Sequence, residues 1–391
     1  MAELIFWLCL ICLAHTYVAF PLFLSVKGKK RKPNQTTFQY GDPQQLPKIS
    51  ILLAAYNEEA VIGKKIESTF NTSYPAEKIE FLIGSDASTD RTDEIIESWQ
   101  KKYPQIQLVK FPGRTGKAGI VNQLAEKASN SVFILTDANV IFTHDTLYQL
   151  VKHFKNPEIA IVGGRIVNKD LKKDGISYQE KTYLDIENLT KFYEGVLWGA
   201  MIGAFGGCYA IRAEYYSPVP KNFFMDDFYI TMHALEQNKK AVNELEAVCY
   251  EDVSNRISEE FRRKVRISIG NFQNLFRYKK LLFPWNNPGL AFSFFSHKVL
   301  RWFGPFFILL ALISNFLLLP LNSFYEITFI LQIAGITLPA WDKLFKFFGI
   351  HNRFLRFASH FYLMNLALLT GFFRFIKGVE SNVWKPTERY Q

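Results

Sequence analysis

Between residues 49 and 154 the sequence alternates short, continuous apolar runs with longer amphipathic segments, and this alternation limits the fold more than any other feature. Continuous apolar runs of this length are typical of strands that are covered on both faces. Strands that alternate with helices at this spacing predict an α/β domain, with a mostly parallel central sheet and helices on both faces. We expect strands at 49–55, 79–84, 106–111 and 131–136, and helices at 59–71, 91–102, 117–129 and 146–154.

Beyond residue 154 the pattern loosens. Small residues let a backbone approach a ligand closely, so we expect Gly206 and Gly207, in the small-residue run at 199–212, to line the wall of a site. We find no internal repeat and no low-complexity tract. The remaining elements that the pattern predicts are a strand at 158–163, an amphipathic segment at 170–197, a strand at 241–250 and a basic helix at 258–280.

Residues 4–26 carry no formal charge over a length that spans a bilayer at a rise of about 1.5 Å per residue. The basic cluster KGKKRK, residues 27–32, follows immediately. A secretory signal peptide has the reverse order, with basic residues before the apolar run and small residues after it. We therefore predict an uncleaved membrane anchor, with the basic cluster and the domain after it in the cytoplasm.

The composition becomes apolar again from residue 283. Spans are expected at 303–319 and 324–341, and 357–375 is a third candidate. The basic, aromatic segment between the last two is typical of a helix that lies in the cytoplasmic interface. Three spans here would put the tail outside, whereas Arg374 and Lys377 favour the inside, so the number of spans and the side of the tail stay open.

These features divide the chain into six segments. The predicted location is the inner, cytoplasmic membrane, with several spans and a cytoplasmic α/β domain. The boundaries that we expect are an anchor at 1–26, a basic and polar linker at 27–47, the α/β domain at 48–282, an interfacial segment at 283–302, transmembrane helices at 303–377 and a tail at 378–391.

The composition also narrows the class of partner. The formal net charge of +10 suits a protein that lies against an anionic membrane surface at least as well as one that binds nucleic acid, and the apolar flanks favour the membrane. Cys9 and Cys12 fall in the anchor, while Cys208 and Cys249 are isolated, with no C-x-x-C pair and no histidine at zinc spacing. A reducing cytoplasm is the simplest interpretation, and we expect no nucleic-acid partner.

Polar side chains follow two of the predicted strands where each one ends. Asp137 and Asn139 follow the run at 131–136, and their oxygens are the hard ligands that Mg²⁺ or Mn²⁺ prefers. The alternative for this pair is an Asx turn that closes the strand. Tyr56 and Glu58 follow the first strand, where a ring and a carboxylate can hold a base or a ribose; a helix start enriched in acids is the alternative.

The second and third strands are also followed by polar residues. Asp86 ends the second strand, before a turn in which helix capping explains Ser88, Thr89 and Asp90 but not Asp86, so we expect Asp86 to contact a ligand. Lys117 opens a predicted helix, where a cation and free N–H groups can meet a diphosphate. The glycine spacing does not fit a Walker A loop, and no G-x-G-x-x-G follows a strand, which disfavours a dinucleotide site.

Two further charged groups lie towards the end of the α/β segment. Asp226 and Asp227 precede an amphipathic helix, where they are either a catalytic carboxylate pair or two helix-capping acids. Arg263 and Arg266 belong to the basic helix, for which a solvated or membrane-facing surface is the alternative.

The order of these motifs is more specific than any one of them. AYNEE, SDASTD, GK-A-x-x-x-N, DAN, DD before an apolar helix and R-x-x-R follow one another between residues 49 and 271. This order resembles the membrane-bound family-2 glycosyltransferases with the GT-A fold. The anchor and the carboxyl-side spans resemble the bacterial polysaccharide-synthase branch of that family, the relatives of cellulose, hyaluronan and poly-N-acetylglucosamine synthases.

The resemblance implies a role for each motif. In that scheme the nucleotide is held by Tyr56, Glu58, Asp86, Lys117 and Asp137, the metal by Asp137 and Asn139, the diphosphate and the acceptor by Arg263, Arg266, Gly206 and Gly207, and the proton by Asp227, with Asp226 beside it.

Two positions depart from the family pattern. Asn139 replaces the second aspartate of the D-x-D metal motif, which removes one negative charge, although an amide oxygen still ligates Mg²⁺. Processive synthases carry Q-x-x-R-W, whereas here Arg266 is followed by Ile267, so the tryptophan that would stack on the acceptor sugar is missing. We therefore expect weaker metal binding, and we leave processivity open.

The expected chemistry follows from these positions. The charge that develops on the leaving diphosphate must be neutralised, by a divalent cation together with Lys117. The acceptor hydroxyl has a very high pKa, so a carboxylate must take its proton, and we assign this step to Asp227, whose pKa the neighbouring charge of Asp226 would raise. One base and in-line displacement predict inversion at the anomeric carbon.

We therefore expect an inverting hexosyl- or N-acetylhexosaminyl-transferase that uses Mg²⁺ or Mn²⁺ and a nucleotide sugar, with a UDP-sugar favoured, to build a cell-surface or secreted polysaccharide. Its expected partners are the donor, the acceptor, the lipid bilayer and proteins of polysaccharide export. Transfer of one sugar to a polyprenyl phosphate or lipid-linked acceptor is the nearer alternative. A catalytically silent membrane scaffold that binds a nucleotide is the alternative of another class.

Overall fold

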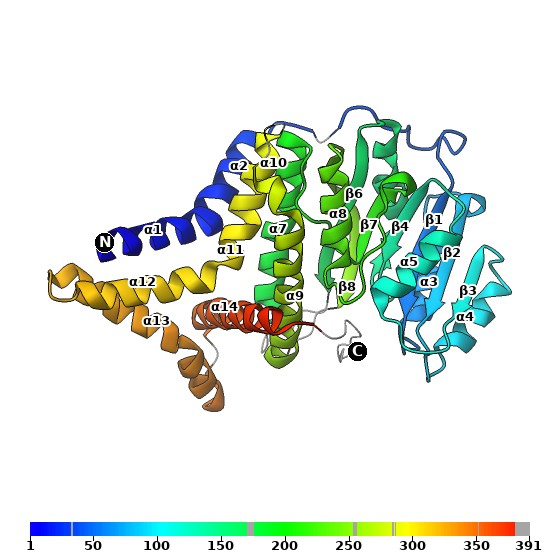
Figure 1. Ribbon diagram of the computed structural model, residues 1–391. Coiled ribbons are helices and arrows are strands. Elements are labelled where there is room, and N and C mark those ends of the chain that lie inside the picture. The colour runs from blue at the N-terminus through cyan, green and yellow to red at the C-terminus, as the bar shows by residue number, and fades with distance from the viewer. Residues whose placement is uncertain are drawn as a thin grey trace.

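The structure, a computed structural model, describes residues 1–32, 34–169, 176–252, 256–283, 285, 287–350 and 352–379. Within these residues eight strands form one sheet, in the order β3-β2-β1-β4-β7-β6-β8-β5 (Figure 1). The strands are β1 (Ile49–Ala55), β2 (Ile79–Ser85), β3 (Ile106–Lys110), β4 (Val132–Thr136), β5 (Ile141–Phe142), β6 (Ile159–Lys169), β7 (Cys208–Arg212) and β8 (Lys240–Asp252).

The first half of the sheet is parallel, as expected. β1 pairs in parallel with β2 and β4, and β2 pairs in parallel with β3. Leu52 and Leu82 face one apolar core that includes α5, while Ile51 and Ile83 face a second core that includes α3, α4 and α6. Helices therefore cover both faces, which explains why every residue of β1 and β4 is buried. The helices are α3 (Ile62–Phe70), α4 (Thr92–Gln100), α5 (Lys117–Lys127) and α6 (Thr146–Val151).

The second half of the sheet is mixed, but four of the seven strand pairings are parallel, so the sheet is mostly parallel, as expected. β7 runs antiparallel to β4 and β6, β6 and β8 are parallel, and β5 is antiparallel to β8. Cys208, the first residue of β7, lies beside Thr136, the last residue of β4. The small-residue run before β7 therefore lies at the edge where the parallel strands end, which is where such sheets bind ligands.

Two long helices lie between the sheet and the apolar helices of the chain. They are α7 (Ser177–Trp198) and α9 (Ile257–Tyr278), and Figure 1 shows them side by side. α7 packs on β8 on one side and on α2 on the other, and α8 (Asp226–Glu236) packs against β8 and α9. Short 3₁₀ turns complete the domain at Ala76–Lys78, Lys152–Lys155, Ala213–Tyr215 and Lys279–Leu282.

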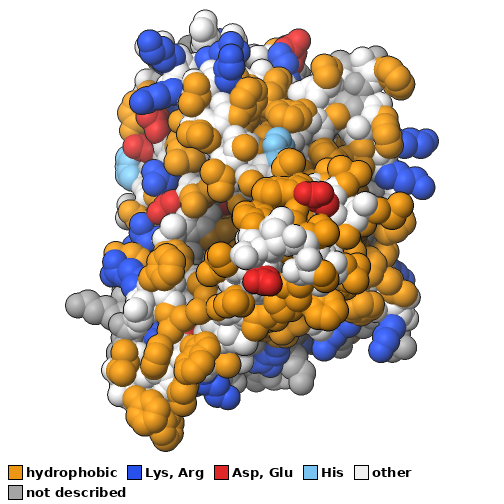
Figure 2. All heavy atoms as spheres, turned by 90° about the vertical axis from the view of Figure 1, so that its left-hand side faces the viewer, with side chains coloured by type: hydrophobic (Ala, Val, Ile, Leu, Met, Phe, Trp, Pro, Cys, Tyr) orange, Lys and Arg blue, Asp and Glu red, His pale blue; other side chains and the backbone are white. Residues whose placement is uncertain are grey.

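The apolar helices extend away from the sheet on the far side of α7 and α9 (Figure 1). Ala2–Gly28 and Ser323–Phe347 are long and apolar enough to cross a membrane, and a third span exists if the two helical segments at 288–302 and 304–318, bent by 62° to each other, act as one. Figure 2 shows that the surface of these helices is largely apolar. The elements are α1 (Ala2–Ala14), a π-helical turn at His15–Ala19, α2 (Phe20–Gly28), α10 (Pro288–Ser293), a second π-helical turn at Phe294–Val299, α11 (Leu300–Trp302), α12 (Gly304–Leu318) and α13 (Ser323–Phe347).

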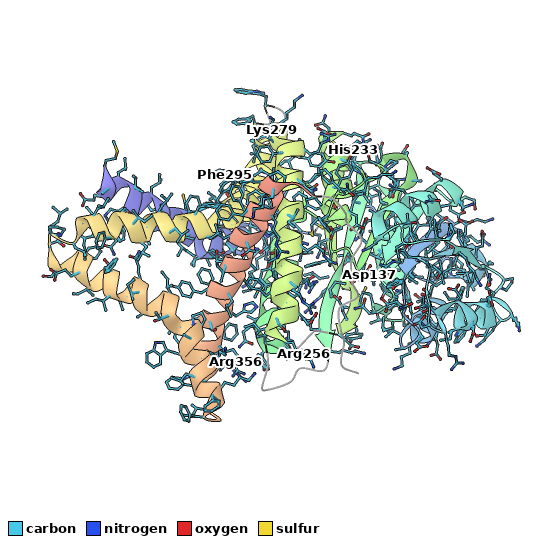
Figure 3. All side chains as sticks on the ribbon, turned by 60° about the horizontal axis from the view of Figure 1, so that its bottom comes forward. Asp137, His233, Arg256, Lys279, Phe295 and Arg356 are labelled. Atoms are coloured by element: carbon cyan, nitrogen blue, oxygen red, sulfur yellow. The ribbon has the colours of Figure 1, made fainter. Side chains whose placement is uncertain are left out.

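The segment at 357–375, a third candidate span in the sequence, belongs to α14 (Arg353–Lys377), which lies along α9 (Figure 3). Ser268 of α9 donates a hydrogen bond to the carbonyl of Leu368 at 2.7 Å, and Gly371 leaves room for this close approach. Among the described helices, α14 is long enough to be a span, with 25 residues, but it is not one of those apolar enough to cross a membrane. Its packing along α9 makes it part of the domain. The predicted tail falls mainly on residues 380–391, outside the described residues.

The position of α14 generates a prediction about the carboxyl end of the chain. If 2–28, 288–318 and 323–347 cross the membrane and α14 does not, the tail lies on the same side as the sheet. A single cysteine placed after Gln391, in a chain without other cysteines, should be labelled from the side that labels a cysteine at Gln100. Labelling of the two positions from opposite sides would contradict this arrangement and would mean that either α14 crosses the membrane or the bent pair at 288–318 does not.

Candidate active site

The carboxyl ends of β1, β2 and β4 bring the predicted motifs to one edge of the sheet. Tyr56 follows β1, Asp86 follows β2 and Asp137 follows β4. Because β1 pairs in parallel with both neighbours, these residues lie close together although they are distant in sequence. Figure 3 labels Asp137 at this edge, on the side of the sheet towards α9.

Asp86 holds the loop that leads to Lys117. Its side chain is fully buried, and its oxygens accept hydrogen bonds from the backbone N–H groups of Thr115 at 2.5 Å and Gly116 at 3.1 Å. The Nε of Arg114 lies 3.1 Å from the same carboxylate. Hydrogen bonds to an ionised carboxylate are stronger than those between neutral groups, so Asp86 fixes the backbone conformation from which α5 begins.

Arg114 is a site residue that our sequence reasoning missed. Its guanidinium lies over the ring of Tyr56, 3.3 Å from the ring centroid, while its Nε contacts Asp86. Tyr56 and Arg114 thus form a flat platform beside a carboxylate, which is the kind of surface on which a nucleobase stacks. The sequence could have indicated Arg114, because it lies three residues before Lys117 in the same motif.

Lys117 connects two acidic motifs that are far apart in the chain. Its Nζ lies 2.8 Å from Oδ1 of Asp137 and 3.6 Å from Oδ2 of Asp226. Burial lowers the pKa of Lys117, but the two carboxylates outweigh that effect and raise it above its usual value. Lys117 is therefore a permanent cation at the point where β4, α5 and α8 meet.

Asp137 and Asp226 also fit a divalent cation. Both direct carboxylate oxygens at one positive group, and Oδ2 of Asp226 is buried without a hydrogen-bond donor among the described residues. No set of three His, Cys, Asp or Glu side chains in the described ranges is placed to hold a metal ion by itself. Mg²⁺ and Mn²⁺ sites that act on phosphates commonly use one or two carboxylates and take further ligands from the substrate, so the donor set is sufficient.

Asn139, the second predicted metal ligand, is buried and has a carboxylate beside it. Its Nδ2 donates a hydrogen bond to Oε1 of Glu251, in β8, at 3.1 Å. No sequence pattern pointed to Glu251, which lies 112 residues away. This contact fixes the orientation of the amide and returns one negative charge to the surroundings of Asp137.

Lys65 supports the turn that carries Asp137 and Asn139. Its Nζ, fully buried, donates to Oγ1 of Thr136 at 2.9 Å and to the carbonyl of Val140 at 2.7 Å. Burial lowers the pKa of Lys65 to about 7, and the two acceptors match the two donors of a neutral amine. Lys65 thus clamps both ends of the turn.

Asp227 lies at the start of α8, beside the small-residue run. Its Oδ1 accepts a hydrogen bond from the N–H of Phe228 at 2.7 Å, and the side chain is buried. Burial, and then the charge of Asp226, raise the pKa of Asp227 to about 6, against the opposing charges of Lys117 and Lys191. A carboxylate with such a pKa is suited to accept a proton near neutral pH.

The glycines before β7 make room for these carboxylates. A methyl group on Gly206 would lie 2.9 Å from Oδ2 of Asp227, and one on Gly207 would lie 3.9 Å from Oδ2 of Asp137. The two predicted wall residues therefore lie against the two predicted catalytic motifs. A side chain at Gly206 would displace Asp227.

The remaining predicted residues lie at the rim of the site. The charges of Asp137 and Asp226 act on the guanidinium of Arg266 in α9, whereas Arg263 lies closer to Glu260, 3.5 Å from its carboxylate. Glu58 begins the segment before α3, where its backbone N–H donates to Thr92 at 2.8 Å. The charges of Asp137 and Asp226 thus reach Arg266, whereas the contact made by Arg263 is with Glu260 on its own helix.

Part of the sequence and the fold match known proteins. Residues 50–217 match the family described as Glycosyl transferase family 2. The chain is 30% identical over 134 residues to the beta-monoglucosyldiacylglycerol synthase of Synechocystis sp., covering 34% of this chain and 27% of that protein. It is 33% identical over 144 residues to the poly-beta-1,6-N-acetyl-D-glucosamine synthase of Staphylococcus epidermidis, covering 36% of this chain and 34% of that protein. The matches span about a third of these relatives.

The whole fold resembles a solved structure. It is the mannosyltransferase PcManGT from Pyrobaculum calidifontis in complex with GDP-Man and Mn²⁺, with a TM-score of 0.72 and 19% sequence identity. The likeness covers 96% of this chain and 99% of that one, and it confirms the predicted GT-A-like fold with flanking apolar helices.

The role of Asp86 can be tested without a substrate. Asp86→Ala removes the acceptor of two backbone hydrogen bonds, each worth about 1.5–3 kcal/mol when the acceptor is charged. Hydrogen exchange of the peptide that contains Thr115 and Gly116 should become at least about tenfold faster. Asp90→Ala, which affects the turn before α4, is the control. Unchanged exchange in Asp86→Ala would show that the loop is held by other contacts.

Proposed function

We propose that this chain, whose residues 50–217 form a family 2 glycosyltransferase domain, is a membrane-bound inverting glycosyltransferase that acts at the cytoplasmic face. The observation that carries the proposal is the meeting of Asp227, Asp226, Lys117 and Asp137 at one edge of the sheet. A base with a raised pKa, next to a cation flanked by carboxylates, is what sugar transfer from a diphosphate requires.

Each residue has one task in this mechanism. Asp227, ionised and buried, takes the proton of the acceptor hydroxyl as the new C–O bond forms on the face opposite the leaving group, so the anomeric configuration inverts. Lys117 and Arg266 stabilise the negative charge on the departing diphosphate. A divalent cation held by Asp137 and Asp226 would add Lewis-acid stabilisation of the same charge. Mg²⁺ and Mn²⁺ are the candidates.

For the donor, a UDP-sugar is favoured over a GDP-sugar. The platform of Tyr56 and Arg114 accepts a base by stacking, and the carboxylate of Asp86 lies beside it. Tyr56, Glu58 and Asp86 are thus proposed to hold the nucleoside, as the family resemblance implies. Stacking does not distinguish one base from another, so a panel of nucleotide-sugar donors has to identify the nucleotide.

Two acceptors are proposed. The poly-beta-1,6-N-acetyl-D-glucosamine synthase among the relatives supports a growing cell-surface polysaccharide, which would call for export partners. The beta-monoglucosyldiacylglycerol synthase supports a lipid acceptor. Ile267 stands where processive synthases carry a tryptophan, and this favours transfer of a single sugar to a lipid-borne acceptor over chain extension.

A silent nucleotide-binding scaffold is less well supported. Asn139 kept this alternative open, because it removes a charge from the metal motif. Glu251, hydrogen-bonded to Asn139, returns that charge, and the buried Asp227 with a pKa of about 6 has no evident role in a scaffold. Tight nucleotide binding with no transfer and no donor hydrolysis would nevertheless identify one.

The test of the proposed function is nucleotide release by the purified full-length protein with Mg²⁺ or Mn²⁺. A panel of UDP- and GDP-sugars identifies the donor, and the length and linkage of the product identify the acceptor. Long polymer from a single encounter would support polysaccharide synthesis, and a single added sugar would support the lipid-borne acceptor. If no donor on the panel is consumed with any acceptor, the proposed function is wrong.

The pair of acids generates a prediction about pH. Because Asp227 must be ionised and has a pKa of about 6, kcat/KM should fall about tenfold per pH unit below pH 6 and level off above it. Asp226→Asn removes the negative charge that helps to raise the pKa of Asp227, so the fall in kcat/KM should begin at a lower pH. Asp227→Asn should lose about 10²–10⁴-fold in kcat.

Rates of nucleotide release, measured between pH 4.5 and 8.5, test the pH dependence of the parent protein and the effects of the two substitutions. Asp93→Asn is the control outside the site. If kcat/KM falls at the same pH in Asp226→Asn as in the parent protein, burial alone sets the pKa of Asp227. Full turnover in Asp227→Asn would overturn the assignment of the base.

A further inference from the structure

Four cationic side chains gather around two buried glutamates where α7 meets the helices that enter the membrane. Glu187 contacts Nε2 of His297 at 3.0 Å, Arg301 at 2.8 Å and the ammonium of Lys298, and Lys191 lies 4.0 Å away. Glu194 lies 2.8 Å from Nδ1 of His297. We refer to Lys191, His297, Lys298 and Arg301 as the cationic cluster.

The cluster holds more basic groups than acidic ones. Both ring nitrogens of His297 lie within hydrogen-bond distance of a carboxylate, that of Glu194 on one side and that of Glu187 on the other. Lys298 and Arg301 also contact Glu187. Asp227, in α8, is a further acid whose charge acts on Lys191. Four basic side chains thus gather around the carboxylates of Glu187 and Glu194.

Two groups of the cluster lack good partners. Nε of Arg301 is buried and has no hydrogen-bond acceptor among the described residues. Lys191, 4% exposed, lies over the ring of Phe205 at 3.4 Å rather than on a carboxylate. Burial, and then the charge of Lys298, lower the pKa of Lys191 to about 7. A network that served only to join helices would be expected to give the Nε–H of Arg301 an acceptor, because a buried donor without one is costly.

The cluster extends from the active site to the membrane. Phe205, under Lys191, directly precedes Gly206, which lies against Asp227. At the other end, Lys298 and Arg301 are partly exposed, with 12% of each side chain accessible, and Tyr17 of the anchor lies 5.8 Å from Arg301.

Both helices depart from α-helical geometry at this junction. His297 and Lys298 belong to one π-helical turn and Tyr17 to another, and the two turns touch through His15 and Ser296 at 2.9 Å. Such turns occur often at functional sites. Phe295, labelled in Figure 3, marks the turn between α10 and α11.

We propose that the cationic cluster binds the phosphate group of a lipid-borne acceptor and so holds the acceptor hydroxyl near Asp227. This inference rests on the proposed function and names its substrate class. A phosphate supplies negative charge and several acceptor oxygens, one of them for the Nε–H of Arg301, and Lys298 can contact the same group from the side of the anchor and Lys191 from the active-site side. A lipid source is favoured over free phosphate because the partly exposed end of the cluster adjoins the anchor and the bent helix pair.

Binding is tested first, with the full-length protein in nanodiscs of neutral lipid. The probes are a polyprenyl phosphate, the matching polyprenol, phosphatidylglycerol and inorganic phosphate. We expect retention of the polyprenyl phosphate and not of the polyprenol, and at least a tenfold loss of affinity in Lys298→Gln and in Lys191→Met. Lys298→Arg keeps the positive charge and should retain most of the affinity of the parent protein. Lys279→Gln, an exposed lysine outside the cluster, is the matched control.

Transfer is tested second, by comparing sugar transfer to the polyprenyl phosphate with hydrolysis of the donor by water. In Lys298→Gln and Lys191→Met the ratio of transfer to hydrolysis should fall at least tenfold, with the effect in the KM for the acceptor. An unchanged ratio would overturn the proposal. So would equal binding of phosphatidylglycerol that displaces the acceptor lipid, which identifies a structural lipid site, or binding of inorganic phosphate alone.

These experiments distinguish failure of the proposed function from failure of the proposed lipid-phosphate site. If the parent protein consumes no donor but binds polyprenyl phosphate through Lys298, the proposed function fails and the lipid-phosphate site stands. If the parent consumes the donor and prefers an acceptor without phosphate, with no effect of Lys298→Gln, the glycosyltransferase stands and this inference fails.

Discussion

The site depends on one interaction, the contact of the Lys117 ammonium with the carboxylates of Asp137 and Asp226. Asp137 ends β4 and Asp226 begins α8, so the ammonium joins the parallel half of the sheet to the helix that carries Asp227. Without a cation between them, these carboxylates would repel each other in a partly buried place, and α8 would not lie so close to β4. The same contact that joins these elements is also the place where the proposed function would put the diphosphate and its counter-ion.

The parts of this structure that the sequence predicted are those set by local pattern. The strand expected at 49–55 is found with the same bounds, and Asp137 lies at a strand end because a buried apolar run stops there. The antiparallel β7 was not foreseen, because a run of small residues does not indicate in which direction the chain enters a sheet. Contacts such as Asn139 with Glu251, 112 residues apart, depend on the register of β8 and cannot be derived from pattern alone.

The layer formed by α7 and α9 explains why both helices carry buried charges. α7 packs on β8 on one side and on α2 on the other, while α9 packs between α8 and α14, so neither helix has a fully apolar environment. Glu180 of α7 contacts His360 of α14 at 2.7 Å and Lys264 of α9 at 3.4 Å, which ties three helices together through one carboxylate. Burial raises the pKa of Glu180, but the charges of Lys264 and His360 outweigh it and lower the pKa to about 2. This carboxylate is therefore ionised over the physiological range, and its charge is available to Lys264 of α9 throughout it.

Asn139 shows how a change at a motif can be offset by its surroundings. An amide in place of a carboxylate lowers the negative charge beside Asp137, and it also allows a neighbour that a second aspartate would repel. Glu251 is that neighbour, because its carboxylate accepts the hydrogen bond that only the amide can donate. The charge is thus moved from the turn after β4 to the adjoining strand β8 without being lost. A cation bound by Asp137 would then be attracted by Glu251 from a second layer, with fewer direct carboxylate ligands of its own. The departure from D-x-D therefore changes where the negative charge lies more than how much of it surrounds the site.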